Sequence, residues 1–237
     1  MGRMGYGYGS EWHLMRYLAR HRKFIEDKIF STIGKSGSIT WLDFEFDSKT
    51  ESLDRELQGL EFLKQGPHQE ILDTWKTWWP TTGRQPSWDA VAWLRPGNCE
   101  EPELLLIEAK AHVEEIKSDS GAGAASREKI LNAFRDVQQD LGIQPQNDWL
   151  KPYYQHANRI AILWFLNNQN KVPSARKSDR AIPTRLINVY FTGEVHQGWQ
   201  CPQTEDEWKS VIKERDLHLG LESPNVDLPV HSIFVKL

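Results

Sequence analysis

The chain has 237 residues, of which 39% are hydrophobic and 26% are charged, and its formal net charge is −4. This composition argues against global disorder, and the acidic balance excludes a strongly basic surface that coats nucleic acid without specificity. The longest uncharged apolar stretch, residues 160–166, is far shorter than the roughly 20 residues of a membrane-spanning helix.

The first residues, MGRMGYGYGS, lack the apolar core of a secretion signal. The two cysteines, Cys99 and Cys201, are too few for a disulfide framework or a cysteine-rich zinc site. We therefore expect a cytoplasmic protein. Two basic blocks offer a local phosphate-binding patch, although solvated faces are the favoured interpretation: Arg16, Arg20, Arg22 and Lys23, and Arg176, Lys177, Arg180 and Arg185.

Hydrophobic spacing in the first half predicts three helices, over residues 10–30, 51–64 and 67–79, and a strand over 39–46. Two further strands are expected over 87–94 (SWDAVAWL) and 103–113 (ELLLIEAKAHV). Their apolar runs are typical of central strands that are buried on both faces.

The second half alternates again between helix and strand. Ser126 caps a helix that ends before Gly142, Pro152 suits the first turn of the next helix, and Thr204 opens a capping box with Glu207. The expected helices run from about residue 126 to 141, from about 152 to 168 and from about 204 to 219, and strands are expected over 185–192 and 230–237. No segment resembles an interdomain linker, so we expect a single α/β domain over residues 1–237.

The most informative segment contains Asp89, Glu108 and Lys110. Asp89 opens one hydrophobic strand, and Glu108 follows 108 − 89 = 19 residues later, near the end of the next. Because side chains alternate along a strand, Glu108, Lys110 and His112 share one face. If the two strands pair as a hairpin, Asp89 approaches Glu108.

Burying two carboxylates and an ammonium costs several kcal/mol per ion unless the charges are paired or bind a metal. Carboxylate oxygens suit Mg²⁺, which can polarise a phosphoryl oxygen and lower the pKa of bound water. Lys110 is then available to orient or deprotonate that water and to offset developing charge. This combination suits the hydrolysis of a phosphodiester.

Asp89 followed by Glu108-Ala109-Lys110 resembles the D…ExK motif of the PD-(D/E)XK nuclease superfamily, whose members have the restriction-endonuclease-like fold. The resemblance covers roughly residues 50–195. It implies an αβββαβ core, with a mixed central sheet flanked by helices and embellishments at both termini. It departs from the family pattern at the proline, because Pro86 lies three residues before Asp89 and Trp88 lies directly before it.

The same resemblance implies Mg²⁺ or Mn²⁺ as cofactor and nucleic acid, with DNA favoured, as substrate. Asp89, Glu108 and the carbonyl of Ala109 would be the metal ligands, and Lys110 the catalytic lysine. The alternative interpretation of the motif is a salt bridge at the end of the strand, between Glu108 and Lys110 or a neighbour. Residues 153–166 (YYQHANRIAILWFL) and 187–194 (INVYFTGE) are also similar to a bacterial branch of this fold.

Gln155, Asn158 and Arg159 fall on one side of a predicted helix. Some exonuclease branches of the superfamily carry a Gln and a Tyr on a helix that lines the site. Here Gln155 lies 155 − 108 = 47 residues after Glu108, and no Tyr follows at the expected offset. We expect Gln155 and Arg159 to contact phosphate or the metal shell, or else to pair with a neighbouring loop.

Three weaker candidates remain. His112 can reach the edge of the site, although a structural histidine is the favoured interpretation. An upstream helical glutamate often completes the family's site, and the candidates are Glu26, Glu56, Glu61 and Glu70, although a solvated charge is the favoured interpretation of each. The tryptophans at 75, 78 and 79 can stack on bases, but core packing is favoured.

The leading hypothesis is a metal-dependent nuclease. The alternatives are a catalytically silent domain of this fold that binds nucleic acid or a partner protein, and an unrelated hydrolase that uses paired carboxylates. No membrane partner is expected, and a protein partner or a homo-oligomer is left open.

Overall fold

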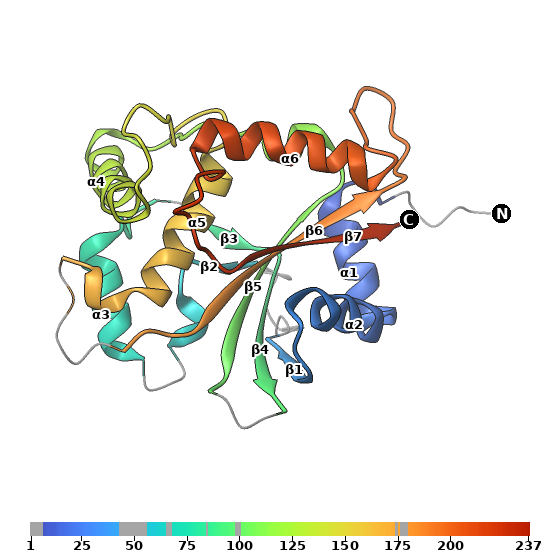
Figure 1. Cartoon of the computed structure of the whole chain (residues 1–237), viewed down its shortest axis with the longest axis horizontal. Helices are drawn as coiled ribbons and strands as arrows, with labels where there is room; N and C mark the ends of the chain where they lie inside the picture. Colours follow the sequence, from blue (N-terminus) through green and yellow to red (C-terminus); the bar gives the residue numbers. More distant parts are fainter. Residues whose placement is uncertain are drawn as a thin grey trace, which may run out of the picture.

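The computed structural model describes residues 7–42, 56–64, 68–83, 85–97, 101–173, 175 and 180–237. In these ranges five strands form one mixed sheet in the order β1-β4-β5-β6-β7. Strand β4 is antiparallel to its neighbours β1 and β5, and β6 is parallel to its neighbours β5 and β7 (Figure 1). The strands are β1 Gly37–Trp41, β4 Ala90–Pro96, β5 Glu103–Lys110, β6 Thr184–Thr192 and β7 Val230–Lys236.

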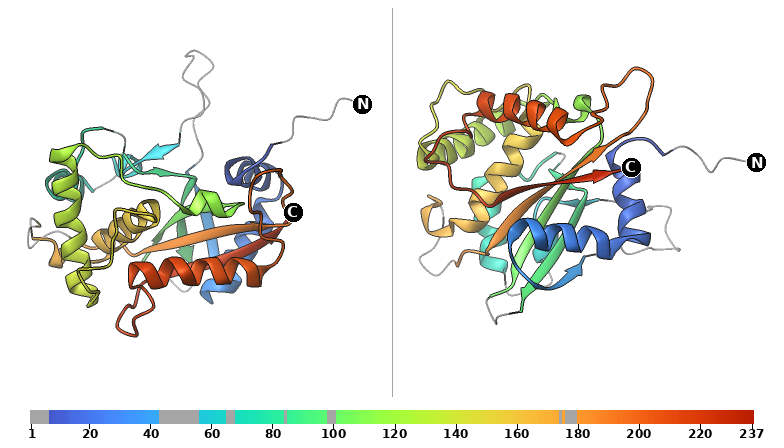
Figure 2. Two further views of the ribbon diagram at one scale, coloured as in Figure 1. Left: turned by 90° about the horizontal axis from the view of Figure 1, so that it is seen from above. Right: turned by 45° about the vertical axis from the view of Figure 1, so that its right-hand side comes forward.

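Helices cover both faces of this sheet (Figures 1 and 2). The first face is covered by α1 (Ser10–Arg20) and α2 (Arg22–Ile33). The other face is covered by α3 (Gln69–Trp78), α4 (Ala124–Leu141), α5 (Tyr154–Asn167) and α6 (Glu205–Leu219). The mixed α/β class is therefore confirmed. No helix in the described ranges is long and apolar enough to cross a membrane.

The short elements are β2 (Leu57–Gln58), which pairs with β3 (Ser87–Trp88) in a second, two-stranded sheet, and the 3₁₀ helices η1 (Glu61–Leu63), η2 (Val113–Ile116) and η3 (Gln169–Lys171).

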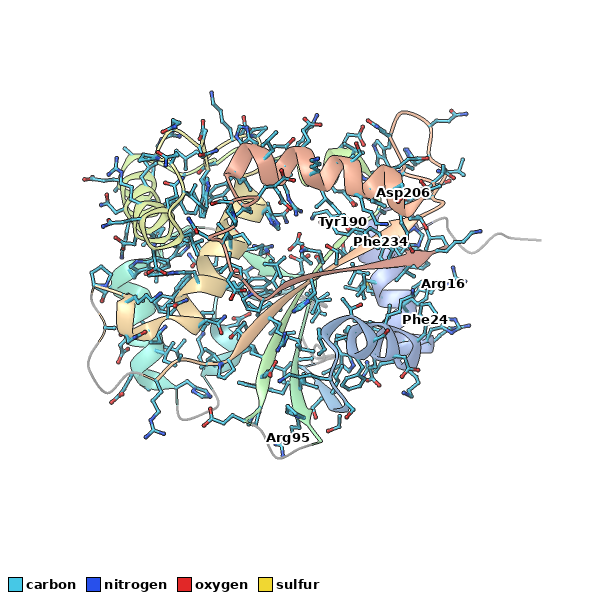
Figure 3. The ribbon with its side chains drawn as sticks, in the orientation of Figure 1. Arg16, Phe24, Arg95, Tyr190, Asp206 and Phe234 are labelled. Atoms are coloured by element: carbon cyan, nitrogen blue, oxygen red, sulfur yellow. The ribbon has the colours of Figure 1, made fainter. Side chains whose placement is uncertain are left out.

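Strand β5 decides which face carries the polar residues. Leu104 and Leu106 pack into the layer of α3 to α6, whereas Leu105 and Ile107 pack into the layer of α1 and α2. Glu108 continues the first set, so its side chain faces α5. On the same side, the rings of Tyr190 and Phe234 lie 5.7 Å apart between the sheet and α6 (Figure 3).

Two predicted helices need correction. The helix expected over 10–30 is interrupted at His21, whose φ of −134° is not helical, and two helices result. The helix expected over 51–64 is wrong for residues 56–64, and residues 51–55 lie outside the described part. Gly59, at φ +54°, turns the chain, and β2 pairs with β3 instead. Leu60 and Leu63 are buried in this turn, at 2% and 1% exposed, and Leu57 is half-buried.

The predicted strands also differ at their ends. The strand expected over 87–94 is broken at Asp89, which separates β3 from β4. The strand expected over 103–113 ends at Lys110, because η2 follows. Of the strand over 39–46, residues 43–46 lie outside the described part. Helix α4 begins at Ala124, so Ser126 lies inside its first turn rather than at its cap.

Gly220 ends α6 and Gly34 ends α2, and both adopt the left-handed backbone conformation, with φ of 76° and 65°. The two positions can therefore be compared directly. An added Cβ at Gly220 would lie 2.8 Å from Ile143 Cγ2, whereas the space around Gly34 is open to 4 Å. Both Gly→Ala variants should lose about 1 kcal/mol from the positive φ. We expect Gly220→Ala to lose a further 1–3 kcal/mol from overpacking, measured by urea denaturation. Equal losses would contradict this account.

Candidate active site

Asp89 lies at the break between β3 and β4, beside the end of β5. The antiparallel register pairs Ala90 with Ile107, so the residue before Ala90 lies next to Glu108. The Asp89 carboxylate extends this pairing, because its Oδ2 accepts a hydrogen bond of 2.6 Å from the Ala109 backbone N–H. A side chain has replaced a backbone carbonyl in the ladder, which explains why the strand is broken here.

Glu108 is buried, and each of its carboxylate oxygens has a cationic partner. Its side chain is 4% exposed. Oε1 accepts from Lys110 Nζ, and Oε2 accepts from Arg159 Nε at 2.7 Å. Lys110 Nζ also donates to Gln155 Oε1 at 3.1 Å. The strand pair and the first turn of α5 therefore bring together Glu108, Lys110, Gln155 and Arg159.

Arg159 is held on every side. In addition to Glu108, its guanidinium donates to Asn158 Oδ1 at 2.8 Å and to the carbonyl of Ser87. The guanidinium carbon also lies 4.5 Å from the centre of the Trp88 ring, within cation–π range. Because Ser87 and Trp88 form β3, Arg159 connects the small sheet, the main sheet and α5.

These neighbours set the protonation states. Burial and the Glu108 charge raise the pKa of Asp89 to about 7, against the opposing effects of Lys110 and the Ala109 N–H. Burial alone would raise the pKa of Glu108, but Arg159 and Lys110 hold it below its ordinary value. Burial likewise favours a neutral Lys110, but the carboxylates of Glu108 and Asp89 raise its pKa above the ordinary value. Lys110 is therefore an ammonium at neutral pH, which corrects the expectation that it deprotonates water.

The cluster lies at the wall of a cleft of about 690 Å³. Asp89, Gln155 and Arg159 line this cleft, whereas Glu108 lies behind Arg159 and does not. Two further carboxylates, Glu56 and Asp119, also line it. The cleft therefore has more acidic than basic groups, which favours a cationic occupant over an unaccompanied anion.

A much smaller cavity, of about 10 Å³, lies behind the cluster and is lined in part by Lys110, Asn188 and Arg215. Asn188 pairs with Glu108 across β5 and β6, and its buried Nδ2 has no hydrogen-bond partner among the described residues. The volume is close to the minimum that holds one water. A single buried water here would satisfy Asn188.

Two groups beside this small cavity are part of the α6 packing. Arg215 is buried, and it donates to the Tyr190 hydroxyl and to Asp216 Oδ1, both at 2.8 Å. Burial, followed by the charges of Arg215 and Arg159, lowers the pKa of His156 well below its ordinary value. His156 is therefore a neutral imidazole.

His112 is not part of this cluster. Its ring lies 3.0 Å from Glu114 Oε2 and 3.3 Å from Glu115 Oε1, and it stacks on Trp199 with ring centres 4.1 Å apart. The strand ends at Lys110, so the alternation that placed His112 on the face of Glu108 stops before it. We therefore remove His112 from the candidate site.

The upstream glutamates separate into different roles. Only Glu56 lines the cleft, and it is not in a helix. Glu26 accepts from Trp41 Nε1 at 2.9 Å, and Glu61 accepts from the Gln58 N–H at 2.7 Å. Glu70 lines a different cavity. None of the four contacts Glu108 in the described part of the chain.

The tryptophans at 75, 78 and 79 are 4%, 6% and 1% exposed, which agrees with core packing. In the second basic block, Arg185 pairs with Glu103, and residues 176 and 177 lie outside the described part.

Sequence reasoning missed three residues at this site: Trp88, Asn188 and Arg215. Trp88 adjoins Asp89, but the sequence pattern predicts only that it lies in a strand. The other two come from β6 and α6, and their neighbourhood depends on the parallel pairing of β5 with β6 and on α6 packing over it. No local pattern in the sequence predicts either contact.

No family model, curated protein or solved structure matches this chain. The geometry of the site therefore carries the functional argument.

The raised pKa of Asp89 predicts a pH-dependent stability. Between about pH 4 and 7 the folded protein keeps a proton that the unfolded chain has lost, so its free energy of unfolding falls as the pH rises through this window. Asp89→Asn keeps an oxygen for the Ala109 N–H but removes the charge. In EDTA at pH 8 we expect this variant to be more stable than the wild type, by on the order of 1–3 kcal/mol.

The comparison is urea denaturation at pH 5 and pH 8. Asp140→Asn is the control, because Lys171 and Trp164 outweigh partial burial and lower the pKa of Asp140. The control should gain nothing at pH 8. An Asp89→Asn variant with the wild-type pH dependence would contradict the assignment.

Proposed function

We propose that this chain is a metal-dependent phosphodiesterase that cleaves nucleic acid, with DNA as the expected substrate. The observation that carries the proposal is the convergence of Asp89, Glu108 and Lys110 at the ends of two paired strands, where Asp89 lines the cleft and Glu108 and Lys110 lie behind it. Three antiparallel strands (β1, β4 and β5) followed by helices and a parallel strand (β6) also support the restriction-endonuclease-like core that the sequence suggests. The order differs from that core in two places, because α3 and the small sheet stand between β1 and β4, and two helices, α4 and α5, stand between β5 and β6.

The candidate ligands at the site are all oxygen atoms, which are the donors that a hard divalent cation prefers. The Glu108 charge raises the pKa of Asp89, so the two carboxylates lie close enough to repel each other, as they do around a cation. No group of three or more His, Cys, Asp or Glu side chains in the described residues is arranged to hold a metal. Two carboxylates, the Ala109 carbonyl and water would therefore make up the shell, which suits Mg²⁺ or Mn²⁺.

Metal binding at Glu108 would require that one of its present partners moves away. Arg159 Nε already occupies Glu108 Oε2, and Lys110 occupies Oε1. With both carboxylates ionised, the two cations and the two anions sum to zero. A divalent ion would therefore compete with Arg159 for Glu108, and a released guanidinium would be free to bind the substrate phosphate.

The residues of the chain then have distinct roles in the proposed reaction. A bound Mg²⁺ would polarise the phosphoryl oxygen and lower the pKa of a bound water. Lys110, held as an ammonium, stabilises the negative charge that develops on the phosphate. Gln155 accepts from Lys110 and fixes the direction of its ammonium. Arg159 binds the phosphate from the side of the cleft.

The second candidate is a catalytically silent domain of the same fold that binds nucleic acid or a partner protein. The saturation of Glu108 by Lys110 and Arg159 favours it, because a permanently paired carboxylate binds no metal. Metal binding and cleavage decide between the two candidates.

In the active case, the protein should cut DNA only with Mg²⁺ or Mn²⁺, and EDTA should stop cleavage. Lys110→Ala should lose turnover by about 10²–10³-fold and still bind metal, because Lys110 stabilises charge rather than coordinating. Asp89→Ala should lose both, because it removes a ligand. The assays are cleavage of single- and double-stranded DNA and RNA, and metal titration by calorimetry. Undiminished cleavage by Lys110→Ala would exclude its catalytic role, and a wild type that binds no divalent ion would favour the silent domain.

The competition between Arg159 and the metal predicts a rescue. Arg159→Gln leaves the Glu108 charge with Lys110 alone and should destabilise the metal-free protein by about 3–5 kcal/mol. Because the ion no longer has to displace a guanidinium, Mn²⁺ should raise the melting temperature of this variant more than that of the wild type.

Arg215→Gln is the matched control, since Arg215 is also a buried arginine but pairs with Tyr190 and Asp216. It should be destabilised without extra rescue by Mn²⁺. Equal Mn²⁺ shifts in wild type and Arg159→Gln would show that Arg159 does not oppose metal binding.

A further inference from the structure

A second cavity, of about 720 Å³, lies on the same side of the sheet as the cleft but further along β4. Trp93, which lines it, is four residues after Asp89, and this spacing corresponds to about 13 Å along a strand. His68 and Ile71, at the start of α3, line this cavity, whereas Trp79 and Pro80, just past its end, line the cleft. No described residue lines both, so the cavity is a separate site.

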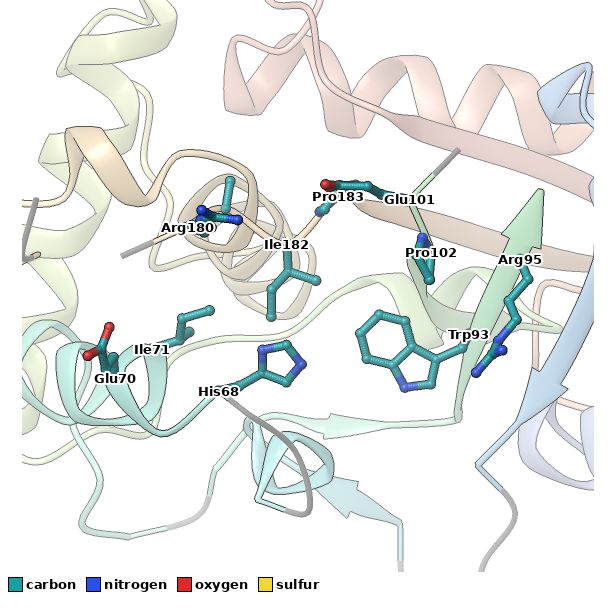
Figure 4. Close-up of a pocket in the computed structure, with 11 residues that line it drawn as sticks. His68, Glu70, Ile71, Trp93, Arg95, Glu101, Pro102, Arg180, Ile182 and Pro183 are labelled. Carbon is teal, nitrogen blue, oxygen red and sulfur yellow. The ribbon is translucent and has the colours of Figure 1, made fainter. Parts of the chain in front are cut away.

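One wall of the cavity is aromatic. The rings of His68 and Trp93 are nearly parallel, at 21°, with centres 6.2 Å apart. Figure 4 shows His68, Trp93 and Ile182 directed into the same space. Burial lowers the pKa of His68, so its imidazole is neutral at pH 7 and offers a flat, uncharged face. A planar, largely apolar group is the best match for this wall.

Both ends of the cavity carry charge. Arg95 and Arg180 line it from opposite ends, with His68 and Trp93 between them (Figure 4). Neither guanidinium forms an ion pair or a side-chain hydrogen bond with the described residues. A guanidinium binds phosphate oxygens in a bidentate manner. Glu101 also lines the cavity and can accept hydrogen bonds from amino groups. The cavity therefore combines a surface for a ring, an unpaired guanidinium for an anion at the Arg180 end and an acceptor for an amine.

We propose that this cavity binds a nucleoside monophosphate unit, with its base against Trp93 and His68 and its phosphate at Arg180. The volume is within the range of small-molecule sites. The unit comes from a free nucleotide or from the phosphorylated end of a nucleic acid strand, since both present the same base and phosphate. The site binds in the absence of divalent ions and does not depend on the proposed cleavage activity.

The test is calorimetric titration of the full chain in EDTA with AMP, with adenosine and with a short single-stranded oligodeoxyadenylate that carries or lacks a terminal phosphate. AMP should bind saturably at millimolar concentration or below, and adenosine about tenfold more weakly. Arg180→Gln should weaken AMP about tenfold and leave adenosine unchanged, because it removes only a phosphate contact. Trp93→Leu should weaken both by tenfold or more.

Two controls separate this site from the cleft and from misfolding. Gln155→Ala, which alters the cleft, should leave AMP affinity unchanged. His68→Ala lies at the start of α3, where little packing is lost, and should weaken AMP and adenosine together if Trp93→Leu proves unstable.

Saturable AMP binding that Trp93→Leu weakens supports the site with a free nucleotide as its ligand. Binding of the phosphorylated oligonucleotide alone, also weakened by Trp93→Leu, supports the site with a strand end as its ligand. The proposal is overturned by no saturable binding of any probe at millimolar concentration, by equal affinity for AMP and adenosine, or by AMP binding that Gln155→Ala weakens and His68→Ala does not. Failure of cleavage would leave each of these outcomes unchanged.

Discussion

The Glu108 carboxylate, buried between Lys110 and Arg159, is the interaction on which the site depends. A charge in this position is tolerated only because both oxygens are paired, and removal of either partner leaves an uncompensated ion in the interior. The pairing also determines the protonation states, because it keeps Glu108 ionised and Lys110 an ammonium. Burial and the negative charge of Glu108 in turn raise the pKa of Asp89. The chemistry available to the cleft follows from this division of charge.

Arg159 also connects the buried Glu108 to other elements of the fold. Its guanidinium contacts α5, the main sheet and β3 at once, through Asn158, Glu108 and Ser87. The position of β3 in turn fixes the break at Asp89 and the edge of the cleft. An arginine in this place connects three parts of the fold, and under the proposed function the same contacts would make it compete with a metal for Glu108. The pairing of both Glu108 oxygens explains how the cluster is stable without metal.

Two further carboxylates, one after β5 and one after β6, connect the ends of these strands to the amino end of α1. Glu115 accepts from the Ser10 N–H and from the Ala111 N–H, and Glu194 accepts from the Gly9 N–H at 3.0 Å. Negative charge at a helix amino terminus is favourable. These contacts hold α1 directly behind the strand that carries Glu108 and Lys110, so the site has packed structure on both faces of the sheet.

The sequence by itself determined the class of fold and the three central residues of the site. The apolar runs over residues 87–94 and 103–113 predicted buried central strands, and the 19-residue spacing put Asp89 next to Glu108 once the strands paired. The polar side of α5 likewise predicted Gln155 and Arg159. These inferences hold because strand and helix periods are local properties of the chain.

Only the tertiary structure decided the rest. It broke the strand at Asp89, turned the chain at Gly59 and ended β5 before His112, because side-chain contacts with distant segments outweighed local preference. It brought Asn188 and Arg215 behind the site through the parallel pairing of β6 and the packing of α6. It also placed Arg159 on Glu108, a contact that joins α5 to β5. A sequence specifies which side chains are available, but the partners of a buried charge are set by packing between segments far apart in the chain.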